Sequence, residues 1–174
     1  MAGFLDFKDA RCKDCYKCLR ECPVKAIKVV DRHAKIIDDR CILCGHCTKV
    51  CPQNAKSVHS ERADVERLLR GGNVIASVAP SFVSSFNLQD FSVMRAALRS
   101  IGFADAEETS VGAREVTAQY KKLLEGGTFK NFITSCCPAV NRMIELYYPQ
   151  ALPYLAPVDT PMVAHAKMIR ARNK

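Results

Sequence analysis

The stretch "CKDCYKCLRECP" at residues 12–23 returns 29 residues later as "CILCGHCTKVCP" at residues 41–52. Both segments read C-x2-C-x2-C-x3-C-P. Residues outside the cysteines also repeat, such as Asp9 with Asp38 and Arg11 with Arg40. An internal duplication of this kind predicts two similar half-sites that face each other across a pseudo-two-fold axis.

The cysteine spacing is typical of bacterial ferredoxins that bind two [4Fe–4S] clusters, in which the fourth cysteine of each run binds the other cluster. Zinc sites use two pairs of ligands rather than two tetrads that each precede a proline, so the pattern disfavours zinc. The sequence therefore predicts one cluster bound by Cys12, Cys15, Cys18 and Cys51, and a second cluster bound by Cys41, Cys44, Cys47 and Cys22.

The segment between the two motifs, "AIKVVDRHAKIID" at residues 26–38, predicts a small hairpin with its turn near residues 31–33. It completes a ferredoxin-type fold of about 55 residues, whose apolar core is small. We expect the two clusters to supply much of the folding free energy of this domain.

The chain of 174 residues has ten cysteines and a formal net charge of +8. No apolar run reaches the roughly 18 residues of a membrane helix, and residues 1–12 do not resemble a secretory signal. We expect a cytoplasmic protein with reduced thiols and without membrane insertion. Its basic residues are interleaved with acids, which disfavours a nucleic-acid partner and favours an acidic redox partner protein. Two clusters of net charge about −2 would lower the total to about +4.

Strand and helix patterns alternate after residue 60. Residues 60–72 predict a helical linker that ends at Gly71 and Gly72. Strands are expected at 73–80, 103–110 and 129–135, and helices at 92–102, 111–127, 136–149 and 161–174. The sequence thus predicts an α+β two-domain protein: a 2[4Fe–4S] ferredoxin-type domain at 1–59 and a partial α/β domain at 73–174 with a parallel sheet. Neither of the common glycine-rich nucleotide-binding motifs occurs.

The last two cysteines, Cys136 and Cys137, are adjacent and follow a predicted strand directly. Open α/β sheets bind ligands at this end of their strands, and a helix N-terminus lowers the pKa of a thiol. Three interpretations stay open: a buried couple of small apolar thiols, a partial metal site that a missing or separate polypeptide completes, or a redox-switching pair.

Three segments, "SVAPSF" at 77–82, "TSCCP" at 134–138 and "TPMVAHAKMIR" at 160–170, lie behind the double ferredoxin motif. With that motif, they resemble the large subunit of iron-only ([FeFe]) hydrogenases over essentially the whole chain. The resemblance implies that Cys137 corresponds to one ligand of the family's catalytic cubane. It implies that Cys136 corresponds to the thiol that shuttles protons to the diiron site.

The sequence also departs from the family pattern. The later P-C-x-x-K and C-x-x-G-C motifs, which carry the other three cubane ligands in the family, do not occur. Ala139 and Val140 stand where the family has Gly-Trp. Gln119, Tyr120 and Leu123 stand near the place of its proton-relaying carboxylates. We therefore expect no catalytic residue in this chain alone, with Cys137 as a possible metal ligand only if a missing C-terminal hydrogenase-like region completes its site.

These observations favour an iron-sulfur protein that transfers electrons to or from a redox partner. The alternatives are the N-terminal portion of a hydrogenase, whose reaction would be a hydrogenase-type oxidation or reduction, and a hydrogenase-like redox sensor. His46 is expected at the surface, because thiolates already fill the positions around it. His33, His59 and His165 are expected to be surface or local-structure residues.

Overall fold

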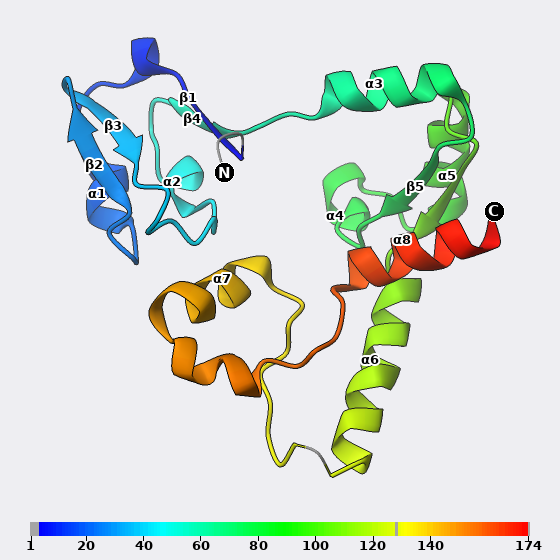
Figure 1. The fold of residues 1–174 in the computed structure, drawn as a ribbon. Coiled ribbons are helices and arrows are strands. Elements are labelled where there is room, and N and C mark those ends of the chain that lie inside the picture. The colour runs from blue at the N-terminus through cyan, green and yellow to red at the C-terminus, as the bar shows by residue number, and fades with distance from the viewer. Residues whose placement is uncertain (1–3, 128, 174) are drawn as a thin grey trace. The chain divides into compact units, whose positions relative to one another are not determined.

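The structure is a computed structural model that describes residues 4–127 and 129–173. The chain divides into two units by its internal contacts (Figure 1). The first contains Met1–Ser60 and Pro138–Leu152, and the second contains Glu61–Cys137 and Pro153–Lys174. The sequence motifs alone did not indicate that residues 138–152 belong with the cysteine-rich segment.

The first unit is built from short strands and helices around the two cysteine motifs. Its elements are β1 (Leu5–Phe7), α1 (Lys17–Glu21), β2 (Ile27–Val30), β3 (His33–Ile36), α2 (His46–Lys49), β4 (Lys56–Val58) and α7 (Pro138–Tyr147). Short 3-10 helices lie at Asp9–Arg11 and, across the boundary of the units, at Pro149–Tyr154.

The repeat in the sequence is also a repeat in strand pairing. β2 and β3 form the predicted antiparallel hairpin, in which Val29 pairs with Ala34. β1 and β4 pair in the same way, with Leu5 opposite Val58. Leu5 is 29 positions before Ala34, and Val58 is 29 positions after Val29, so the two pairs are equivalent in the repeat. The turn residues Asp31 and Arg32 both have positive φ, as two-residue hairpin turns of type I′ require. The two halves of this unit therefore have equivalent registers.

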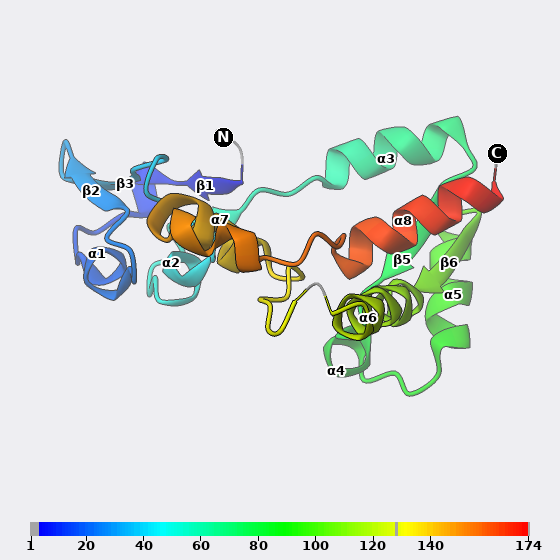
Figure 2. The same cartoon turned by 60° about the horizontal axis from the view of Figure 1, so that its bottom comes forward.

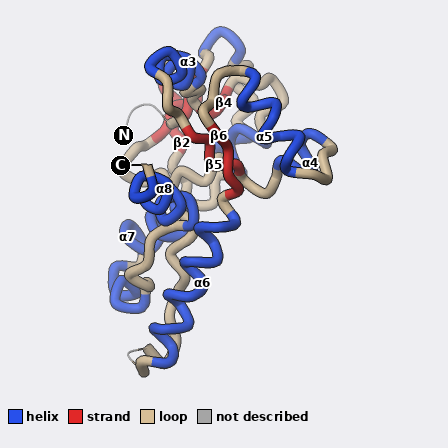
Figure 3. Tube along the Cα trace, turned by 90° about the vertical axis from the view of Figure 1, so that its right-hand side faces the viewer, coloured by secondary structure: helices blue, strands red, loops and turns tan. Residues whose placement is uncertain are grey.

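The second unit contains one parallel strand pair and most of the helices. Its elements are α3 (Arg62–Gly71), β5 (Ile75–Val78), α4 (Phe82–Phe86), α5 (Phe91–Ser100), β6 (Asp105–Glu108), α6 (Ser110–Glu125) and α8 (Pro161–Arg172). β5 and β6 pair in parallel, with Ile75 opposite Asp105, and α4 and α5 lie in the connection between them. The two strands lie side by side, and helices make up most of the unit (Figure 3).

α8 packs across the N-terminal end of α6 (Figure 1), and the contact of the two helices is also visible from a second direction (Figure 2). Gly112 allows this close approach, because a Cβ at this position would lie 2.2 Å from the carbonyl oxygen of Pro161 and 2.7 Å from Cβ of His165. The side chain of Thr160 accepts a hydrogen bond from the N–H of Val163 and caps the helix. Pro161, at its first position, needs no N–H partner there.

The strand predicted at residues 129–135 does not form in the described part of that segment. A single parallel bridge joins Ile133 to Leu155, through hydrogen bonds of 2.7 Å to Tyr154 and 2.9 Å from Ala156. Phe129 and Phe132 contact each other, and Phe132 contacts Tyr120 on α6. The apolar residues that suggested a strand therefore pack as a loop against α6 instead of extending the β5–β6 pair.

The prediction that His165 lies at the surface or serves only local structure is wrong. His165 is fully buried, and its ring joins residues distant in the sequence. Nδ1 lies 2.8 Å from Oγ of Ser77 on β5, and Nε2 lies 3.2 Å from Oε2 of Glu107 on β6. The spacing of apolar residues in α8 does not indicate that His165 is buried, because the alanines and methionines of this helix leave its buried face poorly defined. The predicted α+β two-domain fold class is confirmed.

Candidate metal centre

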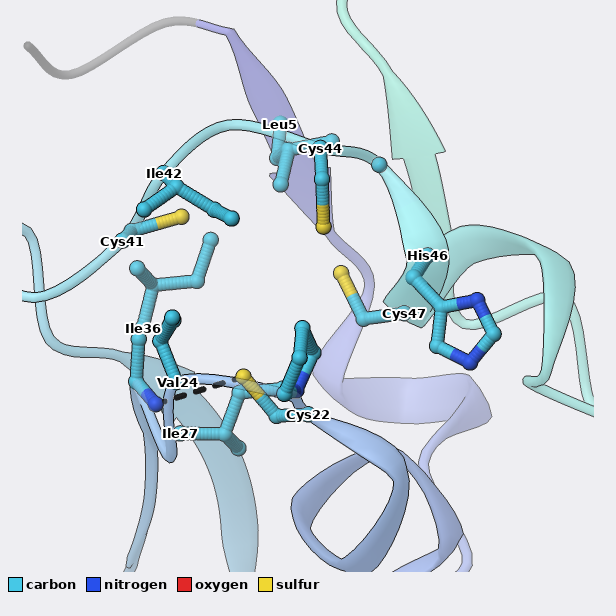
Figure 4. Close-up of a pocket in the computed structure, with 13 residues that line it drawn as sticks. Leu5, Cys22, Val24, Ile27, Ile36, Cys41, Ile42, Cys44, His46 and Cys47 are labelled. Atoms are coloured by element: carbon cyan, nitrogen blue, oxygen red, sulfur yellow. Dashed lines mark hydrogen bonds between the residues drawn. The ribbon is translucent and has the colours of Figure 1, made fainter. Parts of the chain in front are cut away.

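Two cavities lined by sulfur atoms lie in the first unit. We call site 1 the cavity of Cys12, Cys15, Cys18 and Cys51, and site 2 the cavity of Cys22, Cys41, Cys44 and Cys47. At site 2 the four sulfur atoms point toward one shared space, and the ring of His46 points away from it (Figure 4). The structure thus brings together the same two groups of four cysteines that the spacing predicts as ligand sets.

The loops that carry the cysteines turn sharply, and they turn at equivalent positions. Non-glycine residues rarely adopt positive φ, yet both motifs contain such residues. The positions of positive φ in and just after the motifs form matched pairs, each separated by 29 residues: Asp14 and Leu43, Tyr16 and Gly45, Lys25 and Asn54. One short loop thus supplies three of the four thiols that line each cavity.

Backbone N–H groups surround the sulfur atoms. The N–H of Ala26 donates to Sγ of Cys22, and the N–H of Ala55 donates to Sγ of Cys51, both at 3.3 Å. The N–H of Leu43 donates to Sγ of Cys41 at 3.4 Å. Hydrogen bonds to cluster-ligating sulfur are one of the means by which a protein tunes an iron-sulfur cluster.

The thiols of the two sites differ in their electrostatic surroundings. Backbone N–H groups of Ala34 and Asp14 hold the pKa of Cys12, in site 1, below its ordinary value. Burial raises the pKa of Cys41 and raises that of Cys47 to about 11, both in site 2. Site 1 therefore has the more polar surroundings and site 2 the drier ones.

The donor sets fit two [4Fe–4S] cubanes. Each site offers four thiols and no competing oxygen or nitrogen ligand is required, which is the ligation that cubanes use. Asp14 and His33 lie beside Cys12, and the potential ligand atoms of these three residues are within 4.8 Å of one another. Since Cys12 belongs to the tetrad of site 1, we interpret Asp14 and His33 as its polar surroundings. A bound cubane would supply one-electron chemistry at each site.

Helix α7 lies against the loop that leads into site 2. Nε of Arg142 donates to the carbonyl oxygen of Cys41 at 2.6 Å, and Nη2 donates to that of Asp38 at 3.1 Å. The hydroxyl of Tyr147 donates to the carbonyl oxygen of Arg40 at 2.7 Å. These contacts hold the backbone beside one of the thiols that line site 2, and no pattern in the sequence indicates them.

Cys136 and Cys137 belong to the second unit, and both are exposed. They directly precede α7, which begins at Pro138, so the predicted position at a helix start is confirmed. Ser135, which precedes them, is buried; its N–H donates to the hydroxyl of Tyr120 and its hydroxyl donates to the carbonyl oxygen of Val158. The exposure of both thiols argues against the interpretation as a buried apolar couple.

These sites define the class of the protein. Residues 11–55 match the family described as "4Fe-4S dicluster domain", so the chain is an iron-sulfur protein of the dicluster type. Residues 72–174 match the family described as "Iron only hydrogenase large subunit, C-terminal domain". The chain therefore belongs to the iron-only hydrogenase large-subunit family.

Two curated relatives agree with this membership. The chain is 34% identical to the periplasmic [Fe] hydrogenase large subunit of Nitratidesulfovibrio vulgaris over 91% of its own length and 42% of that protein. It is 30% identical to iron hydrogenase 1 of Clostridium pasteurianum over 59% of its own length and 21% of that protein. The chain thus spans less than half the length of these relatives.

Among the residues that the structure describes, no helix has the length and apolar character needed to cross a membrane.

The sequence contains a signal for one residue that is not among the predicted site residues. Lys56 breaks the internal repeat, because Ile27 stands at the equivalent position. Arg142 and Tyr147 gave no such signal, since they reach the cysteine loop only through the folded arrangement of the first unit.

Proposed function

We propose that this chain binds one [4Fe–4S] cluster at site 1 and one at site 2 and transfers single electrons to or from a redox partner protein, without catalysing a reaction alone. The observation that carries the proposal is the pair of equivalent four-sulfur cavities within one small unit. The two sites are built by one duplicated loop geometry, so both are suited to the same type of cluster.

The exposed cysteines give electrons a route to the surface. Cys15 of site 1 and Cys44 of site 2 are both exposed, whereas Cys18 and Cys51 are buried. Each cluster would therefore approach solvent on one side. A partner that docks over such an edge can exchange electrons without entering the protein.

The proposal is tested by anaerobic reduction of the reconstituted chain with dithionite, removal of the excess reductant and titration with an oxidised viologen dye. We expect about two electrons per chain to reach the dye, one from each cluster. No hydrogen should form when the same chain is supplied with reduced viologen. Delivery of no electrons by a chain with full cluster content would contradict the electron-transfer role.

Lysines beside the motifs, among them Lys13, Lys17 and Lys49, are exposed and favour an acidic partner. Electron delivery to an acidic acceptor protein should then slow as salt is added, since salt screens exposed charges beyond about 10 Å at 0.1 M. A rate that does not depend on salt would count against this docking. We keep the cytoplasm as the proposed location, although the name of the Nitratidesulfovibrio relative places that protein in the periplasm.

A second candidate function is that of the N-terminal portion of a hydrogenase or hydrogenase-like redox sensor. The exposed Cys136–Cys137 pair favours it, because exposed thiols at a helix start can accept a metal centre that further ligands complete. Here Cys137 would serve as one ligand. Adding a polypeptide that carries the missing family motifs, during reconstitution, should raise the iron content only if Cys137 is intact; equal iron in Cys137→Ala would contradict this role.

A further inference from the structure

The two sites have similar backbones, but different side chains line their cavities. Site 2 is lined by apolar side chains, among them Leu5, Val24, Ile27, Ile36 and Ile42 (Figure 4). Site 1 is lined instead by polar and charged side chains, among them Asp14, Lys17, Gln53 and Lys56. Since the loops are equivalent, this difference arises from the side chains alone.

The largest difference lies at one matched pair of positions. Ile27 begins β2, lines site 2 and pairs with Ile36 on β3. Lys56 begins β4, lines site 1 and pairs with Phe7 on β1. The lysine is only 5% exposed, and its Nζ lies 5.1 Å from the centroid of the Phe7 ring. The second repeat thus places a buried lysine where the first repeat has an isoleucine.

A buried positive charge affects the energy of a nearby cluster. Reduction adds one electron to a thiolate-ligated cubane, so its net charge changes from about −2 to about −3, and no bond forms or breaks. A cation in surroundings of low dielectric stabilises the added charge more than a solvated cation does. Dry apolar walls have the opposite effect, because they disfavour additional charge.

From this geometry we propose that Lys56 raises the reduction potential of the cluster at site 1 above that of the cluster at site 2, so that site 1 is reduced first. In the chain reduced by one electron, the electron is then at site 1, and the reduced cluster at site 2 is the stronger reductant. This order rests on the proposed division of the eight cysteines between the two sites.

Other charges near the sites do not reverse this order. Asp14 at site 1 lies 3.7 Å from the guanidinium of Arg32, which offsets its charge. Arg142 is a cation beside site 2, but its guanidinium binds the backbone carbonyl oxygens of Cys41 and Asp38, and it does not line that cavity. The charge of Lys56 also reaches Cys47 of site 2, but Lys56 lines the cavity of site 1 and not that of site 2.

A redox titration of the reconstituted chain, followed by electron paramagnetic resonance, measures the order directly. Cys15→Ser and Cys44→Ser, at equivalent exposed positions, mark the signals of site 1 and site 2 respectively by changing one ligand. We expect the signal that Cys15→Ser alters to appear first as the potential is lowered. If the signal that Cys44→Ser alters appears first, the proposed order is wrong. This assignment does not depend on any variant of Lys56.

The variants Lys56→Met and Lys56→Gln test whether the charge of Lys56 causes the difference in reduction potential between the two sites. Either should lower the potential of site 1 by about 59 mV, which for one electron is a tenfold change in the ratio of reduced to oxidised cluster, and should shift site 2 by less. Lys56→Arg keeps the charge and should keep the order. Ile27, at the equivalent position of the other repeat, is a buried apolar residue, which favours folding of the neutral variants, and iron content verifies each variant.

The outcomes separate this inference from the function on which it rests. A chain that holds fewer than two clusters overturns the proposed function and the inference with it. Two clusters whose potentials differ equally in the wild type, Lys56→Met and Lys56→Gln overturn the inference alone, and electron transfer stands. A shift confined to site 1 in the neutral variants, absent in Lys56→Arg, supports it.

Discussion

At the scale of single residues, the folded chain depends on positions where no other side chain fits. Gly112 is the clearest of these, because α6 and α8 approach each other through it. A methyl group there would meet backbone atoms of Pro161 and His165, which cannot move aside as a flexible side chain can. His165 itself connects β5, β6 and α8 through Ser77 and Glu107. The second unit is thus held by a few specific contacts as well as by its apolar side chains.

Gly112→Ala should therefore destabilise the second unit. Overpacking costs about 1–3 kcal/mol, and contact with backbone places this case at the upper end, whereas alanine gains only about 1 kcal/mol in a helix. We expect a net loss of about 2 kcal/mol in the free energy of unfolding, measured by urea denaturation followed by circular dichroism. Gly71→Ala in α3 is the matched control, because a Cβ there meets nothing within 4 Å. Equal stability of the two variants would contradict the packing argument.

The carboxylate of Glu107 gives this network a pH dependence. Burial alone would raise the pKa of Glu107, but hydrogen bonds from Arg172 and His165 outweigh it and hold the pKa below its ordinary value of 4.5. A carboxyl whose pKa is lowered by folding stabilises the fold above pH 4.5 and loses that contribution as the pH falls through its folded-state pKa.

The variant Arg172→Met tests the direction of this pH dependence. Arg172 is half exposed, so we expect a destabilisation of only about 0.5–1 kcal/mol at pH 7, and a smaller one as the pH falls below 4.5. Hydrogen exchange of the β5, β6 and α8 amides, corrected for intrinsic rates, measures both values. Arg170→Met, at an exposed position of the same helix, is the control. A penalty that is the same at both pH values would show that Glu107 is not the partner that matters.

At the scale of elements, much of the fold could be predicted from the sequence, and the failures have physical causes. The β2–β3 hairpin, the parallel β5–β6 pair and helices α3, α5, α6, α7 and α8 follow from local patterns and from glycine and proline stops. The strand predicted at residues 129–135 does not form, because aromatic residues that pack against α6 give this loop the same composition as a buried strand. The contact of α7 with the cysteine loop was not predictable, because it joins residues about a hundred positions apart.

Arg142 should anchor the loop that carries Cys41. Its hydrogen bond to the Cys41 carbonyl oxygen is partly buried and involves a charged donor, and such a bond contributes about 1.5–3 kcal/mol. Its bond to the Asp38 carbonyl oxygen is exposed and contributes less. In Arg142→Ala we expect the amide of Cys41, which donates to the carbonyl oxygen of Ile37, to exchange at least tenfold faster. We also expect site 2 to lose iron to a chelator faster than site 1.

Glu145→Ala serves as the control for this experiment, since Glu145 is exposed on the same helix. If exchange at Cys41 is unchanged in Arg142→Ala, the hydrogen bonds do not restrain the loop in solution.

At the scale of the whole molecule, the sequence repeat gives both the similarity of the two metal sites and the difference between them. The division of cysteines into two sets of four was predictable, because spacing fixes which thiols can share a cubane. The different polarity of the two sites could have been read from Ile27 and Lys56, once the repeat was aligned beyond the cysteines. The role of Cys136 and Cys137 could not, because the spacing of two adjacent thiols does not distinguish a partial metal site from a redox-switching pair.

The count of iron and acid-labile sulfide per chain after anaerobic reconstitution tests the central claim most directly. Two cubanes predict about eight iron and eight sulfide ions, with no change in the double variant Cys136→Ala/Cys137→Ala. About four of each would contradict the claim that both sites hold a cluster. About twelve of each, falling to about eight in the double variant, would show that the vicinal pair holds a third cluster and that the chain is more than an electron carrier.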